Sequence, residues 1–203
     1  MELAHLQTGG ELNTALAARS TICQRQSDMN IREVIAAVNQ MQADGVIDRY
    51  AIGGAVGATF YLEPVATLDV DIFVAFRSEP GSLLVSPQPI FDYLKARGGT
   101  VEGEHIIIGG WPIQFLPPTG PLVEEGLAQA VGMDVAGTPA RVLTAEHLAA
   151  VALQTGRAKD KARLLAFIEA GALDAARFQA ILARHALVEA WRKFERQFLS
   201  DTP

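Results

Sequence analysis

Cysteine, long apolar runs and positive charge are all scarce in this sequence of 203 residues. The one cysteine, Cys23, excludes an intramolecular disulfide and a zinc site made of several cysteines, which fits a reducing cytoplasm. No apolar run reaches the length of a membrane span, and the chain does not start with a basic segment followed by an apolar one. We therefore expect no membrane helix and no signal peptide.

The net charge is −6, which argues against a general nucleic-acid binder. The basic residues are nevertheless concentrated in one part of the chain. Residues 157–196 contain nine Lys and Arg against five Asp and Glu, a local balance of +4, whereas residues 1–156 have a balance of −9. The basic region either meets phosphate groups or presents solvated helix faces.

Two glycines follow a short apolar run near the middle of the chain. Ala51-Ile52 is typical of the end of a strand, and Gly53-Gly54 allows the backbone to turn sharply and approach a ligand closely. The pattern from Ala55 to Leu62 then predicts a short helix, whose free N–H groups would face the turn. This arrangement suits a triphosphate.

Two carboxylates begin the next apolar run. Residues Leu68 to Phe76 are apolar and β-branched enough for a buried strand, on which Asp69 and Asp71 would point the same way. Carboxylates so close repel each other unless a cation lies between them or one stays protonated, and Mg²⁺ commonly combines one or two carboxylates with substrate phosphates. The alternative is two exposed carboxylates at a loop edge.

The order strand, Gly-Gly, helix, loop, D-x-D, strand resembles the nucleotidyltransferase superfamily, which includes DNA polymerase β, tRNA nucleotidyltransferases, aminoglycoside nucleotidyltransferases and AbiEii-type toxins. The resemblance covers about Ile31 to Leu199. It implies an α+β fold with a mixed sheet and flanking helices. It also implies that Asp69 and Asp71 hold Mg²⁺ or Mn²⁺, that Gly53 and Gly54 cradle the phosphates of a nucleoside triphosphate, and that a later strand supplies a third carboxylate.

The sequence departs from that pattern at the third carboxylate. The best match lies in Trp111 to Leu116, where the position is Gln114, which carries no charge and cannot act as a general base. Gly109-Gly110 predicts a hairpin in which His105 faces Gln114 and Glu104 points to the other face. His105 is then either a base or phosphate ligand beside the vacant position, or a surface histidine at a strand edge.

A second motif lies downstream, where Gln154 to Lys161 reads QTGRAKDK. It resembles an R-x-K-D element of AbiEii-type and related nucleotidyltransferases. The resemblance implies that Arg157 and Lys159 hold the triphosphate while Asp160 orients one of them. The alternative is an ordinary helix start with these side chains in water.

The chain divides into three expected parts: a leader over 1–28, an α/β core over 29–143 and a helical bundle over 144–203. Thr144 is expected to cap the first helix of the bundle, and Trp191, Phe194 and Phe198 form a stripe typical of a helical core.

Two functions follow. One is a Mg-dependent nucleotidyltransferase that acts on an acceptor hydroxyl of tRNA, a protein or a small molecule. The resemblance to AbiEii-type proteins includes the case in which this enzyme is the toxin of a toxin–antitoxin pair. The other is a binding module for a nucleotide or a partner, which keeps the fold but has lost catalysis with the third acid.

Overall fold

The structure, a computed structural model, describes residues 31–64, 66–67, 69–76 and 86–199. The expected leader, Cys23 and most of the loop after Phe76 lie outside them. A helix over 31–43 comes first, and its buried face carries Val34, Val38 and Met41 as the periodicity predicts. It ends at Gly45, which has a φ of 75°.

The remaining elements are a mixture of strands and helices up to residue 142 and are helical thereafter. In chain order they are β1 (Ile47–Ile52), α2 (Gly54–Ala58), β2 (Val70–Phe76), α3 (Gln88–Lys95), β3 (Thr100–Glu102), β4 (His105–Ile108), β5 (Trp111–Leu116), α4 (Pro121–Ala128), β6 (Val131–Val135), β7 (Thr138–Val142), α5 (Ala145–Thr155), α6 (Ala158–Glu169), α7 (Ala175–Arg184) and α8 (Val188–Phe198).

The strands form one mixed sheet in the order β3-β4-β5-β2-β1-β7-β6, with β2 at its centre. Strand β2 pairs with β1 in antiparallel and with β5 in parallel orientation, and β1 pairs with β7 in parallel orientation. The α+β class that the sequence predicts is confirmed.

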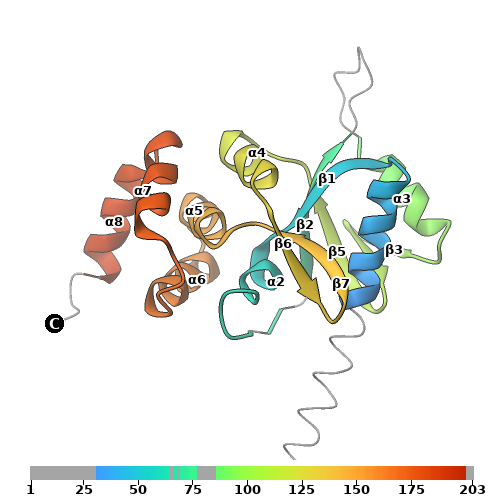
Figure 1. Ribbon diagram of the computed structural model, residues 1–203, viewed down its shortest axis with the longest axis horizontal. Helices are drawn as coiled ribbons and strands as arrows, with labels where there is room; N and C mark the ends of the chain where they lie inside the picture. Colours follow the sequence, from blue (N-terminus) through green and yellow to red (C-terminus); the bar gives the residue numbers. More distant parts are fainter. Residues whose placement is uncertain (1–30, 65, 68, 77–85, 200–203) are drawn as a thin grey trace, which may run out of the picture.

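The two faces of the sheet carry different helices (Figure 1). On one face Ile72 and Val74 of β2 pack with the helix over 31–43 and with α3. On the other face Phe73 of β2 and Leu143 share a core with α4 and α5–α8. Because side chains alternate along a strand, Asp71 lies on the same face as Phe73, toward the helical region.

The helical region starts as its sequence predicts. The Thr144 side chain accepts a hydrogen bond from the His147 backbone N–H, and the Asp174 side chain accepts one from that of Arg177, so each caps a helix start. Trp191 and Phe194 of the predicted aromatic stripe are buried and stacked, with ring centroids 5.7 Å apart, whereas Phe198 is exposed, so the prediction of a core stripe holds for two of its three residues. None of the helices in the described part of the chain is long and apolar enough to cross a membrane.

Candidate active site

Asp69 and Asp71 lie at the start of the central strand and line the same cavity. The Thr67 hydroxyl donates a hydrogen bond to Asp69 Oδ1 over 3.3 Å. Burial raises the pKa of the Asp71 carboxyl above its ordinary value, and the charge of Asp69 raises it further, while Lys159, Arg163 and Arg157 act in the opposite direction. The half-buried carboxylate therefore lies in a field of one anion and three cations.

The two glycines are in direct contact with the carboxylate strand. The Gly53 N–H donates to the backbone oxygen of Asp71 over 2.9 Å. Gly54 has a φ of 57°, and a Cβ at this position would overlap the Asp71 carboxylate. The Gly-Gly turn therefore sets how closely the backbone approaches Asp71, and a side chain at position 54 would displace the carboxylate.

Gln114 lies beside Asp71. The two residues are register partners in the parallel β2–β5 ladder, so their side chains share the face toward the helical region. The Gln114 amide nitrogen Nε2 donates a hydrogen bond to Glu104 Oε2 over 3.2 Å. The position that the resemblance assigns to a third carboxylate is thus occupied by an amide whose nitrogen is bound to a carboxylate.

The predicted orientation of Glu104 is wrong, and the reason is a turn inside the first half of the hairpin. The register of Ile106, Ile107 and Ile108 with β5 is as predicted. However, the strand does not continue upstream of His105, because Gly103, with a φ of 61°, reverses the chain between β3 and β4. Side-chain alternation stops at such a turn, so Glu104 reaches Gln114 instead of pointing to the other face.

His105 stands at the start of β4 and is absent from the lining of both large cavities around the carboxylates, as far as the described residues show. Its role as a base or phosphate ligand stays a prediction.

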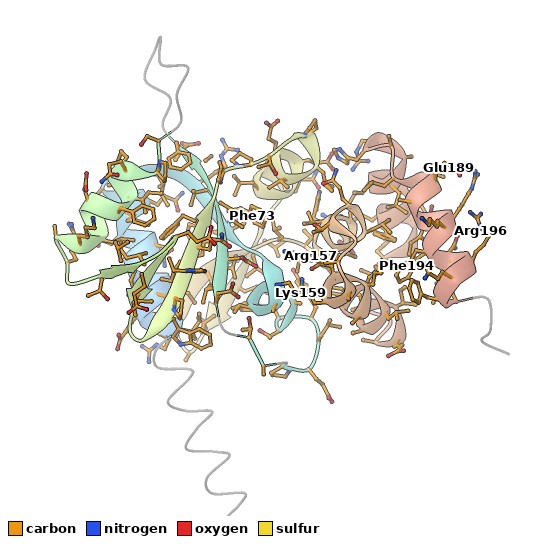
Figure 2. All side chains as sticks on the ribbon, turned by 180° about the vertical axis from the view of Figure 1, so that it is seen from behind. Phe73, Arg157, Lys159, Glu189, Phe194 and Arg196 are labelled. Carbon is orange, nitrogen blue, oxygen red and sulfur yellow. The ribbon has the colours of Figure 1, made fainter. Side chains whose placement is uncertain are left out.

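The R-x-K-D element lies where α5 gives way to α6. Gly156, with a φ of 68°, ends α5, and Arg157 is the N-cap residue of α6. The Asp160 carboxylate is 1% exposed and accepts a hydrogen bond from Arg157 Nε over 2.6 Å. It also accepts one from Arg163 Nη1 over 3.3 Å. Asp160 thus orients Arg157, and Figure 2 shows Arg157 and Lys159 on the side of the helical region that faces the sheet.

Arg163 is the residue of this site that the sequence prediction missed. It lies three positions after Asp160 and four after Lys159, on the same helix face. The spacing alone gives this signal, once the helix start at Arg157 is fixed.

Two cavities meet at Asp71, Lys159 and Arg163. The larger, of about 880 Å³, runs between α2 and α6, and also contains Asp69. Its walls are mostly small side chains, namely Ala55, Ala58, Thr59, Ala66, Thr67, Ala162, Ala166 and Ala170. The smaller, of about 330 Å³, lies toward β5 and α5 and is more polar, with Gln114, Thr119, Gln154, Thr155 and Arg157 in its lining.

The pair of carboxylates fits a hard divalent cation. Asp69 and Asp71 offer oxygen ligands on one face, and a cation between them would offset the charge of Asp69, which adds to the effect of burial in raising the pKa of Asp71. The described residues contain no group of three acidic, histidine or cysteine side chains placed to hold a metal ion.

Neither protein-family models nor curated proteins match this sequence. The fold, in contrast, is similar to that of ANT(2'')-Ia. The crystal structure of ANT(2'')-Ia in complex with adenylyl-2''-tobramycin is 17% identical, with a TM-score of 0.50 over 78% of this chain and 95% of that chain. The solution structure of this antibiotic-resistance factor is 17% identical as well, with a TM-score of 0.50 over 84% of this chain and 97% of that chain. The chain has a nucleotidyltransferase-like fold.

Proposed function

We propose that the protein is a metal-dependent nucleotidyltransferase. The observation that carries the proposal is the larger cavity, in which Asp69 and Asp71 of the central sheet face Lys159 and Arg163 of α6. Paired carboxylates opposite paired cations are what a metal-bound triphosphate needs, because its charge must be neutralised and its position fixed. The nucleotidyltransferase-like fold supports the same reading.

The nucleotide occupies the larger cavity. Its volume of about 880 Å³ lies within the range of small-molecule sites, and both carboxylates line it, whereas only Asp71 lines the smaller one. The alanine side chains offer apolar surface to the base and sugar, and Lys159 and Arg163 act electrostatically on Asp71. Glu63 and Glu169 also line this cavity.

The acceptor enters through the smaller cavity. This cavity shares Asp71, Lys159 and Arg163 with the larger one, so a hydroxyl group in it can reach the phosphate held at these residues. Gln114 and Thr119 supply hydrogen-bonding groups in its lining.

In the reaction the acceptor oxygen forms a bond to the α-phosphorus, and the bond from that phosphorus to the oxygen bridging the α- and β-phosphates breaks. The products are the nucleotidylated acceptor, pyrophosphate and one proton. Asp69 and Asp71 would hold Mg²⁺ or Mn²⁺, which polarises the phosphate and lowers the cost of the developing charge. Lys159 and Arg163 stabilise charge on the phosphate oxygens, and Arg157, held by Asp160, faces the acceptor side.

The acceptor class follows from the smaller cavity. Because this cavity has a volume of only about 330 Å³, we propose a small hydroxyl-bearing molecule as the acceptor, and the ANT(2'')-Ia structure likewise contains a small adenylylated molecule, adenylyl-2''-tobramycin. A tRNA or a protein side chain remains the alternative from the sequence, as does a toxin with a cognate antitoxin.

The test is transfer of label from α-labelled nucleoside triphosphates, with Mg²⁺ or Mn²⁺, to a panel of small alcohols, total tRNA and protein. We expect label on a small molecule and its loss in the Asp69→Asn/Asp71→Asn double variant. A matched control is Asp48→Asn/Asp92→Asn, which removes two exposed carboxylates away from the cavities. Label that survives in the first variant would contradict the proposal.

One observation favours the second function, a binding module without catalysis. Gln114 replaces the acid that the superfamily pattern places beside the D-x-D, and it cannot take a proton. Nucleotide binding that needs Asp69 and Asp71, together with no labelled product from any acceptor, would establish this function instead.

A further inference from the structure

We propose that Glu104 is a positioning residue, which fixes the amide of Gln114 so that its carbonyl oxygen Oε1 is presented beside Asp71 as a neutral ligand for the divalent cation. The proposal rests on the proposed function, because it assigns a third oxygen ligand to the same site.

The first observation is the place of Gln114. It is the register partner of Asp71 on the neighbouring strand and lies on the same face of the sheet. Neighbouring strands of a sheet lie about 4.8 Å apart. Gln114 also lines the smaller cavity together with Asp71. The end of its side chain is therefore within reach of a ligand held by Asp71.

The second observation is the contact that sets which end of the amide faces the cavity. A carboxylate only accepts hydrogen bonds, so Glu104 binds the nitrogen Nε2 of Gln114 and not its oxygen, over 3.2 Å. With Nε2 committed to Glu104, the atom that remains for the cavity is Oε1. An unheld amide presents either end, and its nitrogen cannot bind a cation.

The chemical consequence is a site with three oxygen donors but two negative charges. Hard divalent cations accept amide carbonyl oxygens alongside carboxylates. Groups that orient a ligand from behind change metal affinity about 10- to 100-fold when they are mutated. Glu104, which is exposed and does not line the cavities, acts on the site only through Gln114.

The experiment reverses the amide. In Glu104→Lys the new side chain only donates, so it binds Oε1 and turns Nε2 toward the cavity. Glu102→Lys is the matched control, because Glu102 is an exposed carboxylate in the adjacent strand and the change in charge is the same. Affinity for Mn²⁺ is measured by electron paramagnetic resonance in the presence of the non-hydrolysable α,β-methylene-ATP.

We expect Mn²⁺ affinity to fall roughly 10-fold in Glu104→Lys and less than about 2-fold in Glu102→Lys. The double variant Glu104→Lys/Gln114→Glu should recover the affinity, since the introduced ammonium group then pairs with one oxygen of the introduced carboxylate and leaves the other for the cation. Equal losses in the two single variants, or no recovery in the double variant, would overturn the inference while leaving the proposed function intact. If the unaltered protein binds no Mn²⁺ with the nucleotide analogue, the proposed function itself fails.

Discussion

Glu125 and Asp160 are both surrounded by basic side chains, but the partners come from different places in the fold. Glu125 of α4 accepts hydrogen bonds from Arg184 and His185 at the end of α7, over 2.5 and 2.8 Å, and lies 3.4 Å from Nε2 of the buried His147 in α5. The partners of Asp160 are Arg157 and Arg163, three positions away on either side within α6.

Ion pairs between distant helices and ion pairs within one helix can serve different purposes. The Glu125 cluster connects α4, α5 and the end of α7, which are distant in sequence. Its charged groups therefore pair with one another and hold α5 and α7 to α4. The ion pairs of the Asp160 cluster form within α6 and its N-cap, so they connect no second segment of the chain. In addition, 61% of the Arg157 side chain is exposed. We infer that the Glu125 cluster serves stability and that the Asp160 cluster serves orientation of cations for a ligand.

The largest effect is expected from the cations near Asp160. Lys159→Ala removes a positive charge from both cavities and should lower kcat/KM for nucleotidyl transfer about 100-fold, with little change in Tm. Lys161→Ala is the control, since Lys161 lies two positions away over the Phe198 ring. Similar losses in the two variants would show that general charge, and not the place of Lys159, matters.

Glu125→Gln should have the opposite profile. The variant leaves His147, His185 and Arg184 without their anion, and we expect it to lower the free energy of unfolding by about 2 kcal/mol, less than for a fully buried pair because solvent reaches part of the cluster. Urea unfolding measures the loss. Unchanged stability of Glu125→Gln would show that the Glu125 cluster does not stabilise the fold. Loss of activity without loss of stability would show that Glu125 serves the site instead.

The same carboxylate makes stability depend on pH. Hydrogen bonding from Arg184 lowers the pKa of Glu125 from 4.5 to about 2, so its contribution is complete above about pH 4.5 and is lost as the pH falls toward 2. The stability difference between the natural protein and Glu125→Gln should therefore shrink over this window. Burial also lowers the pKa of His147, so the stability that the neutral imidazole contributes is complete above about pH 6.5 and is lost as the pH falls below that value. Urea unfolding of His147→Gln over the same pH range separates this effect from that of Glu125.

The smallest effect is expected for Arg184→Ala. Half of the Arg184 side chain is in solvent, and His185 still reaches Glu125 in this variant. We expect roughly a third or less of the stability loss of Glu125→Gln, and less still at high salt because exposed charges are screened. A stability loss as large as that of Glu125→Gln would show that the Arg184–Glu125 pair alone accounts for the stabilisation by the cluster.

The sequence predicted the central part of the site because local patterns determine it. Strand alternation gives the shared face of Asp69 and Asp71. The Gly-Gly pair predicts a sharp turn with close approach to a ligand, and the structure adds the contact of Gly54 with Asp71. The register that pairs Ile106, Ile107 and Ile108 with β5 is fixed by a two-residue loop. These features depend on a few neighbouring residues.

Most features that could not be predicted from the sequence depend on contacts between distant segments. Glu125 meets Arg184 and His185 across about sixty positions, and neither α4 nor α7 shows that they pack together. The reversal at Gly103 was missed because the apolar residues after it read as one continuous strand from Val101. The three-part division of the chain, with boundaries at 28 and 143, stays a prediction.

Small side chains make up much of the wall of the larger cavity, and two of them, Ala162 and Ala166 of α6, do not belong to the buried core. Ala162 is exposed and Ala166 half-buried on α6, so a longer side chain at either one would grow into the cavity without crowding the interior. The protein is accordingly suited to engineering by steric matching. If the larger cavity holds the nucleotide as proposed, a bulkier residue at Ala162 would exclude that nucleotide and admit an analogue from which the facing group has been removed.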